Sequence, residues 1–280
     1  MELKYIAVHD GRLSTILKED MKISTGLMNR LKWQDRIFVN GKPEHTDFWV
    51  KTGDTVTVPL EEPDPEYPAE DGPLTVLYED EHLLAVDKPA GMLIHPSRSK
   101  FDGTLANFVV GYYQKSGQKC AFHPVTRLDR DTFGIVLLAK NAHAHALMQN
   151  TDLKKTYHAL VLGFWEKEQG IIDAPIARKP LPSLLREVHP EGKPCITEFE
   201  VLERQEGYTK LQLRPVTGRT HQLRVHCAHC GHPILGDPQY GNEASQFGLT
   251  GQMLCAKRLE FHHPITGEHL ILESDLEATL

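Results

Sequence analysis

The chain carries at residues 123–140 the stretch HPVTRLDRDTFGIVLLAK, in which a charged turn leads into an apolar run. The run that follows Gly134 has the length and composition of a buried strand. A packed strand would hold the charges of Arg127, Asp129 and Arg130 at its edge, where a desolvated carboxylate needs a cation or several hydrogen-bond donors. The turn is therefore either a surface turn whose charges pair with one another or a site of chemistry, and the turn alone does not decide between them.

Length and composition set the class of protein. With 280 residues, the chain is long enough for one large hydrophobic core and a small second module. It contains no run of 18 apolar residues and no charged-then-apolar leader, so we expect neither membrane insertion nor export. Five cysteines without the spacing of a disulfide framework are typical of a reducing cytosol, and we expect a cytoplasmic protein.

The net charge of −7 is unevenly distributed along the chain. Residues 61–72 carry six acidic residues and no basic residue. In residues 1–60, by contrast, nine Lys and Arg residues stand against eight Asp and Glu residues. Because the acidic excess sits mainly in one short segment, the rest of the chain can still present basic surfaces. The net charge therefore does not exclude RNA as a partner.

The first 60 residues alternate a helical pattern with short β patterns. Ser24 is a suitable N-cap, and apolar residues recur at helical spacing after it, through residue 31. Asn40 and Gly41 follow a β-prone run, which is the strongest short signal for a hairpin. Residues 55–58 predict a second short strand. Residues 61–72 are rich in proline and acid without hydrophobic periodicity, so they predict an extended linker and the domain boundary.

This N-terminal segment resembles the alpha-L RNA-binding domain that is named after a small-subunit ribosomal protein. Residues 37–42 and 50–56 follow the hairpin pattern of that domain. Such domains usually have Ser-Arg at the start of the second helix, where this chain has Ser24 and Thr25. The resemblance implies an RNA-binding domain in residues 1–60, and we expect its RNA contacts to come from Arg30, Lys32, Arg36 and Lys42. The alternative is a small helix-hairpin module with an ordinary solvated charged face.

Residues 73–280 predict one larger α+β domain. Many strands with few long helices between them favour a mixed, largely antiparallel sheet. Hydrophobic periodicity predicts helices over 104–115 and about 142–152. The strands are expected at residues 74–78, 83–86, 135–140, 155–163, 195–204, 208–214, near 253–261 and at 269–273.

Three ordered landmarks in this domain resemble the sequence motifs of the RluA-type pseudouridine synthases. The first lies at residues 87–96 and the second at 127–140. The third comprises residues 155–160 together with 217–241. Together they extend over roughly residues 74–270, and the alpha-L-like domain is a common companion in the RluC and RluD branches. The ordered set is far more specific than any one block.

The resemblance implies that the chain isomerises uridine in RNA to pseudouridine without a cofactor or a metal. The family's catalytic aspartate falls on Asp129, its active-site tyrosine on Tyr157 and its basic partner on Arg219. Arg127 matches the arginine that fills the space left by the extruded nucleotide. The remaining residues expected to contact the substrate are His221, Arg224 and Leu254. Ribosomal RNA is favoured as the substrate, transfer RNA is the alternative, and we expect a monomer.

The residue types suit this chemistry. Free aspartate is ionised at neutral pH, so Asp129 needs neither a metal nor a base to act as nucleophile or proton acceptor. A cation beside it would position the carboxylate and offset its burial. Tyr157 can relay a proton and stack on the base. Whether Asp129 attacks the sugar, attacks the base or removes a sugar proton stays open.

The chain departs from the family motifs at three positions. Thr126 stands where the family usually has His, Phe133 where it has Ser, and Cys255 where it commonly has His. None of these replaces a catalytic group. Phe133 is bulkier than serine, so altered packing or altered access of the base is expected there.

Other sites and other functions compete with this interpretation. Cys227 and Cys230 are spaced like zinc ligands, but no second pair completes four ligands, so buried thiols are expected instead. Asp129 and Asp131 could be the paired carboxylates of a nucleoside hydrolase or glycosylase, although a separation of two residues leaves little room for a sugar and a water between them. The third alternative is a noncatalytic RNA-binding factor.

Overall fold

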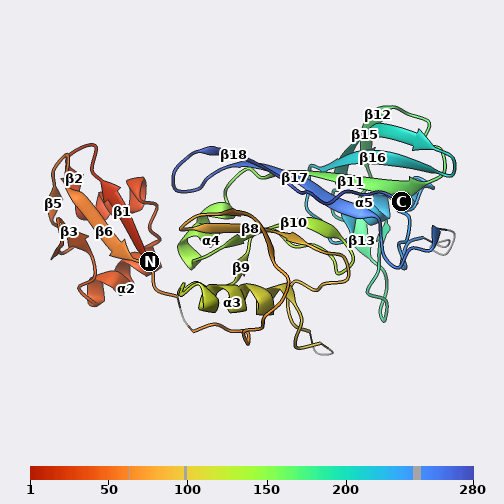
Figure 1. Ribbon diagram of the computed structural model, residues 1–280. Helices are drawn as coiled ribbons and strands as arrows, with labels where there is room; N and C mark the ends of the chain where they lie inside the picture. The colour runs from red at the N-terminus through yellow and green to blue at the C-terminus, as the bar shows by residue number, and fades with distance from the viewer. Residues whose placement is uncertain (63, 98–99, 242–246) are drawn as a thin grey trace.

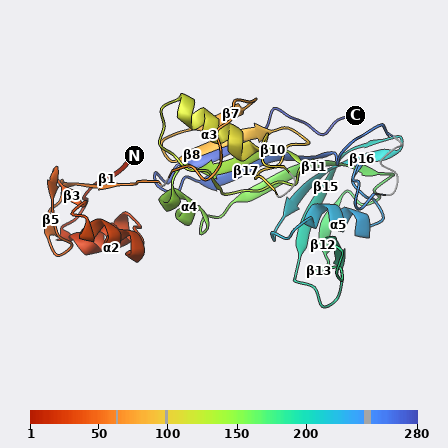
Figure 2. The same ribbon diagram turned by 90° about the horizontal axis from the view of Figure 1, so that it is seen from below.

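The computed structural model describes residues 1–62, 64–97, 100–241 and 247–280, whose strands form a four-stranded small sheet, a ten-stranded large sheet and two two-stranded sheets. Figures 1 and 2 show the small sheet at one end of the molecule and the large sheet extending away from it. The small and the large sheet each have their own buried apolar side chains: residues 3–60 pack together around the small sheet, whereas the large sheet is covered by clusters from residues 83–278.

The N-terminal module combines short strands with one helix, α2 (Thr25–Trp33). Ser24 caps α2, because its Oγ accepts a hydrogen bond from the Leu27 N–H at 3.2 Å. Asn40 and Gly41 have φ angles of 51° and 78°, the positive values that a two-residue hairpin turn requires. The predicted helix and hairpin are confirmed. The other elements are β1 (Glu2–Ile6), β2 (Gly11–Arg12), α1 (Leu13–Thr15), the π-helical turn η1 (Ile16–Asp20), β3 (Phe38–Val39), β4 (Lys42–Pro43), β5 (Trp49–Val50) and β6 (Thr55–Pro59).

Residues 61, 62 and 64–72 form an irregular segment that contacts the larger domain. The Glu62 carboxylate accepts a hydrogen bond from the Ala142 N–H at 2.7 Å and lies 2.9 Å from Nε2 of His123. Farther along, Glu70 accepts a hydrogen bond from the Gly103 N–H at 2.9 Å. Pro63 lies outside the described residues. The acidic side chains of this segment thus hold the chain in place as it crosses to the large sheet.

The large sheet is mixed and mostly antiparallel. Its strands are β7 (Thr75–Glu79), β8 (Leu83–Lys88), β9 (His123–Pro124), β10 (Phe133–Ala139), β11 (Lys154–Leu162), β12 (Gln169–Asp173), β15 (Ile196–Gln205), β16 (Tyr208–Pro215), β17 (Leu254–His262) and β18 (His269–Glu273). The main path is β12-β15-β16-β11-β17-β10-β8-β7, with β18 beside β17 and β9 beside β10. In the described part of the chain, β10 and β17 form the one parallel pair. The predicted α+β class is confirmed.

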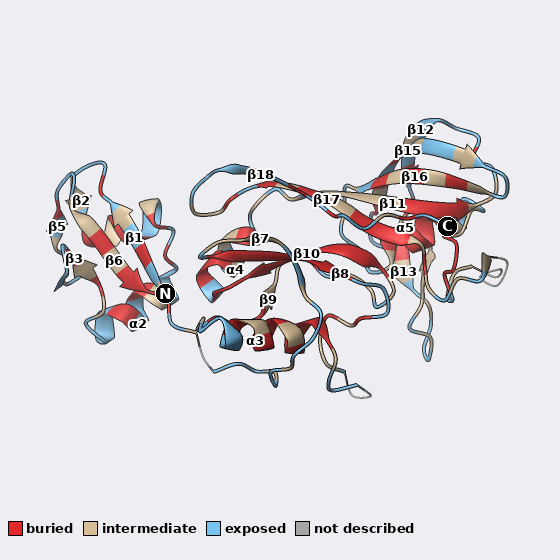
Figure 3. Cartoon of the chain, viewed as in Figure 1, coloured by how far each residue is buried: buried red, intermediate tan, exposed pale blue. Residues whose placement is uncertain are grey.

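Strand β10 lies in the middle of the larger core. Its residues alternate between the two faces: Val136 and Leu138 pack with helix α3 (Leu105–Lys115), whereas Ile135 and Leu137 pack with helix α4 (Ala142–Met148). Figure 3 shows the strand as buried along its length. The buried strand predicted from the apolar run is confirmed, and so is the helix at 104–115. The second predicted helix is shorter, since α4 ends at Met148.

Helix α5 (Gln222–His229) packs against the other half of the sheet, where Leu223 and Cys227 contact the apolar side chains of β11 and β16. The hairpin of β13 (Ile176–Arg178) and β14 (Arg186–Val188) projects from the same end of the molecule (Figure 2). Within the four described ranges, every helix is too short or too polar to cross a bilayer.

Candidate active site

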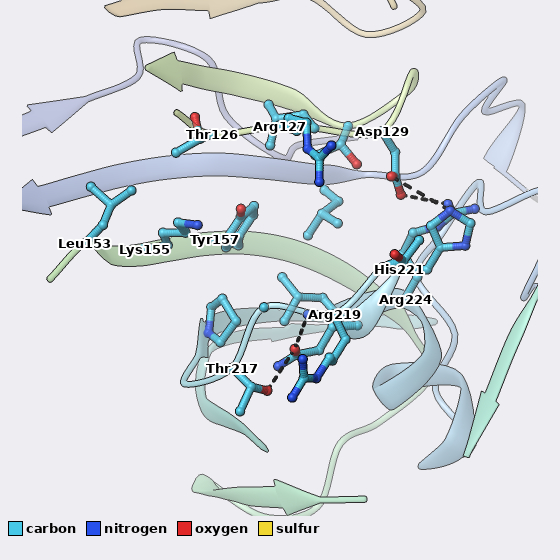
Figure 4. A pocket seen from close by; sticks show the side chains of 18 of the residues that line it. Thr126, Arg127, Asp129, Leu153, Lys155, Tyr157, Thr217, Arg219, His221 and Arg224 are labelled. Carbon is cyan, nitrogen blue, oxygen red and sulfur yellow. Dashed lines mark hydrogen bonds and ion pairs between the residues drawn. The ribbon is translucent and has the colours of Figure 1, made fainter. Parts of the chain in front are cut away.

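A cavity of about 630 Å³ opens between the turn at residues 125–132, strand β11 and the segment 215–224 (Figure 4). Its walls therefore come from both halves of the large sheet. All candidate residues that the sequence placed in this domain line it: Arg127, Asp129, Tyr157, Arg219, His221, Arg224 and Leu254. The basic candidates of the N-terminal module do not line it, because that module lies at the far end of the molecule (Figure 1).

Buried hydrogen bonds fix the turn that carries Asp129. The Thr126 hydroxyl accepts a hydrogen bond from the Leu137 N–H at 2.9 Å, which ties the turn to β10. The fully buried Lys88 ammonium donates to the carbonyl of Arg130 at 2.8 Å and to two carbonyls of its own loop, those of Pro89 and Met92. Burial lowers the pKa of Lys88 to about 8, although the nearby negative charges of Asp131 and Asp129 act to raise it. The turn is held from both sides.

Asp129 is paired with Arg224. Nη1 of Arg224 lies 2.8 Å from Oδ2 of Asp129, while Nε and Nη2 of the same guanidinium bind both carboxylate oxygens of Asp237 at 2.7 and 2.8 Å. Arg224 and Asp237 are buried, whereas a third of the Asp129 side chain remains exposed towards the cavity. Burial would lower the pKa of Arg224, but Asp237 and Asp129 raise it, so the guanidinium stays charged.

The prediction that Arg219 is the basic partner of Asp129 is therefore wrong. Nε of Arg219 instead donates to the Pro194 carbonyl at 3.3 Å, and its backbone N–H donates to Oε1 of Gln222. The physical reason is the start of helix α5. Residue 219 lies in the loop before the helix, whereas Arg224 lies in its first turns, where Asp237 directs the guanidinium towards Asp129. The sequence signal for this was present in Asp237, inside the third landmark.

His221 lies on the other side of the Asp129 carboxylate. Its Nε2 is 3.8 Å from Oδ1 of Asp129, and its Nδ1 hydrogen-bonds the Tyr240 hydroxyl at 2.8 Å. The backbone at His221 is left-handed, with φ of 56°, so the chain turns sharply just before α5. Burial lowers the pKa of His221 even though the charge of Asp129 opposes this, and the imidazole is neutral at pH 7.

Tyr157 and Leu254 contribute to the apolar part of the cavity. They come from the neighbouring strands β11 and β17, and Leu254 is buried. Burial and the charge of Asp129 raise the pKa of Tyr157 to about 12, so the phenol is protonated at neutral pH. Within the described ranges the phenol oxygen has no hydrogen-bond partner, which leaves it available to a ligand.

The structure also bears on the competing interpretations of Asp131, Phe133 and Cys255. Asp131 does not line the cavity and binds Arg130 through two hydrogen bonds of 2.9 and 2.8 Å, so it cannot act with Asp129 across a sugar. Phe133 and Cys255 pack together in the core rather than on the cavity wall. Of the two effects expected of Phe133, this position in the core favours altered packing over altered access of the base.

The two cysteines with zinc-like spacing lie in different environments. Cys227 is buried in α5, as expected, but Cys230 is exposed at the end of the helix, so the prediction of two buried thiols is wrong for Cys230. In the described ranges, His, Cys, Asp and Glu side chains nowhere gather in threes in a way that could hold a metal ion.

Comparison with known proteins identifies the family. The model of the RNA pseudouridylate synthase family matches residues 82–229, which include the Asp129 turn, Tyr157 and Arg224. The chain belongs to this family. The predicted resemblance is thereby confirmed, and the chain is an RNA pseudouridine synthase rather than a glycosylase or a noncatalytic binding factor.

Curated relatives align with the synthase over nearly its whole length. It is 36% identical to the uncharacterized RNA pseudouridine synthase YhcT of Bacillus subtilis, over 97% of this chain and 92% of that protein. It is 33% identical to the ribosomal large subunit pseudouridine synthase C of Vibrio cholerae, over 96% of this chain and 90% of that protein. Among solved structures, the human RNA pseudouridylate synthase domain containing 1 protein superposes with a TM-score of 0.61 and 26% identity, covering 75% of this chain and 86% of that one.

Proposed function

We propose that the synthase isomerises uridines of large-subunit ribosomal RNA, with Asp129 as the acting carboxylate. The observation that carries this proposal is the position of Asp129. Its carboxylate faces the cavity, and the buried Arg224 binds one of its oxygens. Asp237 in turn fixes the position of the Arg224 guanidinium. A charged carboxylate fixed in this way can react without reorganising its surroundings. The relatives named ribosomal large subunit pseudouridine synthase C and D support the choice of RNA.

The reaction requires only groups that the cavity offers. The bond between the anomeric carbon and N1 of the base breaks, and the base turns and rejoins through its 5-carbon. The proton on that carbon is then lost and N1 gains one, so the overall change is an isomerisation. Asp129 assists the bond exchange, and the neutral phenol of Tyr157 relays the proton from the 5-carbon. Leu254 and the ring of Tyr157 hold the detached base and exclude water, which would otherwise hydrolyse the intermediate.

Arg127 is placed to assist the extrusion of the uridine. It lies on the exposed side of the Asp129 turn, at the edge of the cavity. A uridine must leave its stack to reach Asp129, which costs a few kcal/mol. A guanidinium that enters the vacancy can stack on the neighbouring bases and offset part of that cost.

Replacing Tyr157 by phenylalanine tests the proton relay. We expect single-turnover formation of pseudouridine to fall by about 10²-fold, because the relay is lost while the aromatic ring still holds the base. The melting temperature should not change, since the hydroxyl makes no hydrogen bond within the described protein. A variant that reacts at the normal rate would show that another group removes the proton.

The N-terminal module is proposed to bind RNA away from the cavity. Arg30, Lys32 and Lys42 are exposed on α2 and on the hairpin, so they can reach phosphates. Arg36 differs from them, because it forms an ion pair with Glu61 at 2.5 Å. We expect the double variant Arg30→Gln/Lys32→Gln to weaken RNA binding and to lower the slope of log affinity against log salt by about 1.5. A slope equal to that of the wild type would remove these residues from the interface.

The direct test of the substrate is pseudouridine mapping of total RNA from cells that lack the gene, complemented by wild type or by Asp129→Asn. We expect one or more large-subunit ribosomal sites to disappear and to return only with wild type. Sites lost from transfer RNA instead would contradict the proposed substrate while preserving the proposed chemistry. A ribosomal substrate also accords with the predicted cytoplasmic location.

A further inference from the structure

A second cavity adjoins the first one and is not used by the chemistry described above. It measures about 510 Å³ and is lined by the β13–β14 hairpin, the turn at residues 191–193 and the loop at 218–220. The loop residues Gly218, Arg219 and Thr220 line both cavities. The two cavities are therefore adjacent, and the second one is called the groove below.

The groove is strongly basic. Four cationic side chains line it, against the single carboxylate of Glu191: Arg178, Arg186, Lys193 and Arg219. Throughout the described chain, none of the four is ion-paired with a carboxylate. Arg178 and Arg186 are also register partners across the hairpin, where like charges repel each other. The fold tolerates this repulsion, which an anionic ligand would relieve.

One side chain couples the groove to the active site. The Tyr240 hydroxyl accepts a hydrogen bond from the Arg186 N–H at 2.9 Å and bonds Nδ1 of His221 at 2.8 Å. The Arg224 guanidinium lies over the Tyr240 ring, 5.1 Å from its centroid. Strand β14 is thus fixed relative to the residues that surround Asp129, so the groove and the cavity have a defined spacing.

We propose that this groove binds the phosphodiester backbone of the RNA strand next to the extruded uridine. The proposal rests on the proposed function, because the strand must leave the cavity on both sides of the reacting nucleotide. Arginines bind phosphate oxygens through paired N–H donors, and such contacts position the strand without reading its sequence. Arg219 therefore binds the RNA strand rather than the Asp129 carboxylate.

The double variant Arg178→Gln/Lys193→Gln tests the groove. The probe is an unmodified large-subunit ribosomal RNA transcribed in vitro, and the measurement is its dissociation constant over roughly 50 to 200 mM salt. We expect the slope of log affinity against log salt to fall by about 1.5, because two phosphate contacts are lost. A salt dependence that coincides with that of the wild type would overturn the proposal.

Two controls make the result specific. Lys119→Gln/Lys167→Gln removes the same charge from exposed lysines that line neither cavity, and it should leave affinity, slope and activity unchanged. An equal loss in this variant would also overturn the proposal, since it would assign the effect to net charge. The melting temperature of the groove variant should equal or exceed that of the wild type, because Arg178 and Arg186 no longer repel each other.

RNA affinity and pseudouridine formation are measured separately in this experiment. If the wild type forms no pseudouridine in this RNA but the groove variant still loses salt-dependent affinity, the proposed substrate fails and the groove stands as an RNA site. If the wild type forms pseudouridine and the two salt dependences coincide, the groove proposal fails and the proposed function stands.

Discussion

Asp129→Asn is expected to lower the rate of pseudouridine formation by about 10⁴-fold or more while leaving the affinity for RNA nearly intact. The asparagine amide has the shape of the carboxylate and can still face Arg224, so the cavity should keep its form. It lacks the negative charge that attacks or accepts a proton, so the chemical step has no substitute for it. The measurement is single-turnover product formation beside a binding titration. Loss of binding in a folded variant would contradict the catalytic role.

Asp131→Asn provides a matched control on the same turn. Asp131 lies two residues farther along, pairs with Arg130 and does not line the cavity. We expect this variant to retain nearly the full rate, because it removes the same charge from the same loop without touching the reacting atoms. If both variants were equally inactive, the loop conformation rather than the Asp129 carboxylate would control the reaction.

Arg224→Gln is expected to have the second largest effect, on stability as well as on rate. Asp237 has no exposed surface and would lose the guanidinium that binds both of its oxygens. Leaving one member of a buried ion pair alone costs about 3–5 kcal/mol of unfolding free energy. The rate should fall by about 10³-fold, since Asp129 also loses the cation that positions it. Urea unfolding measures the first effect, and single-turnover kinetics at a temperature where the variant is folded measures the second.

Arg219→Gln distinguishes the role of Arg219 from that of Arg224. Its guanidinium donates to a backbone carbonyl and pairs with no carboxylate in the described structure, so we expect unchanged stability and a loss confined to RNA affinity. If Arg219→Gln instead abolished the chemical step at saturating RNA while Arg224→Gln remained active, the assignment of the two arginines would have to be exchanged.

The features that were predicted correctly are determined by residues that lie close together in the sequence. Strand β10 follows from an uninterrupted apolar run, helix α3 from apolar positions at helical spacing, and the Asn40–Gly41 turn from the backbone freedom of two residues. The partner of Asp129 could not be predicted in this way. It depends on a carboxylate at residue 237 that orients Arg224, and this contact forms only after the sheet and α5 have assembled.

Two other functional features were missed for related reasons. Lys88 looks like an exposed turn residue in the sequence, yet its ammonium is buried and binds the carbonyl of Arg130, 42 residues away. The β13–β14 hairpin has strands of only three residues each, and their short polar pattern carries no periodic signal. In both cases the decisive contacts are made with parts of the chain that are distant in sequence.

The position of β17 has a consequence for biosynthesis. This strand, residues 254–262, lies between β11 and β10 in the middle of the sheet, although most of the other strands precede it in the chain. The sheet of a nascent chain therefore cannot be completed until β17 has left the ribosome. Asp129 and Tyr157 come from opposite sides of β17. A polypeptide interrupted before residue 254 would contain Asp129, Tyr157 and Arg224 but would lack the strand that joins the two parts of the sheet that carry them.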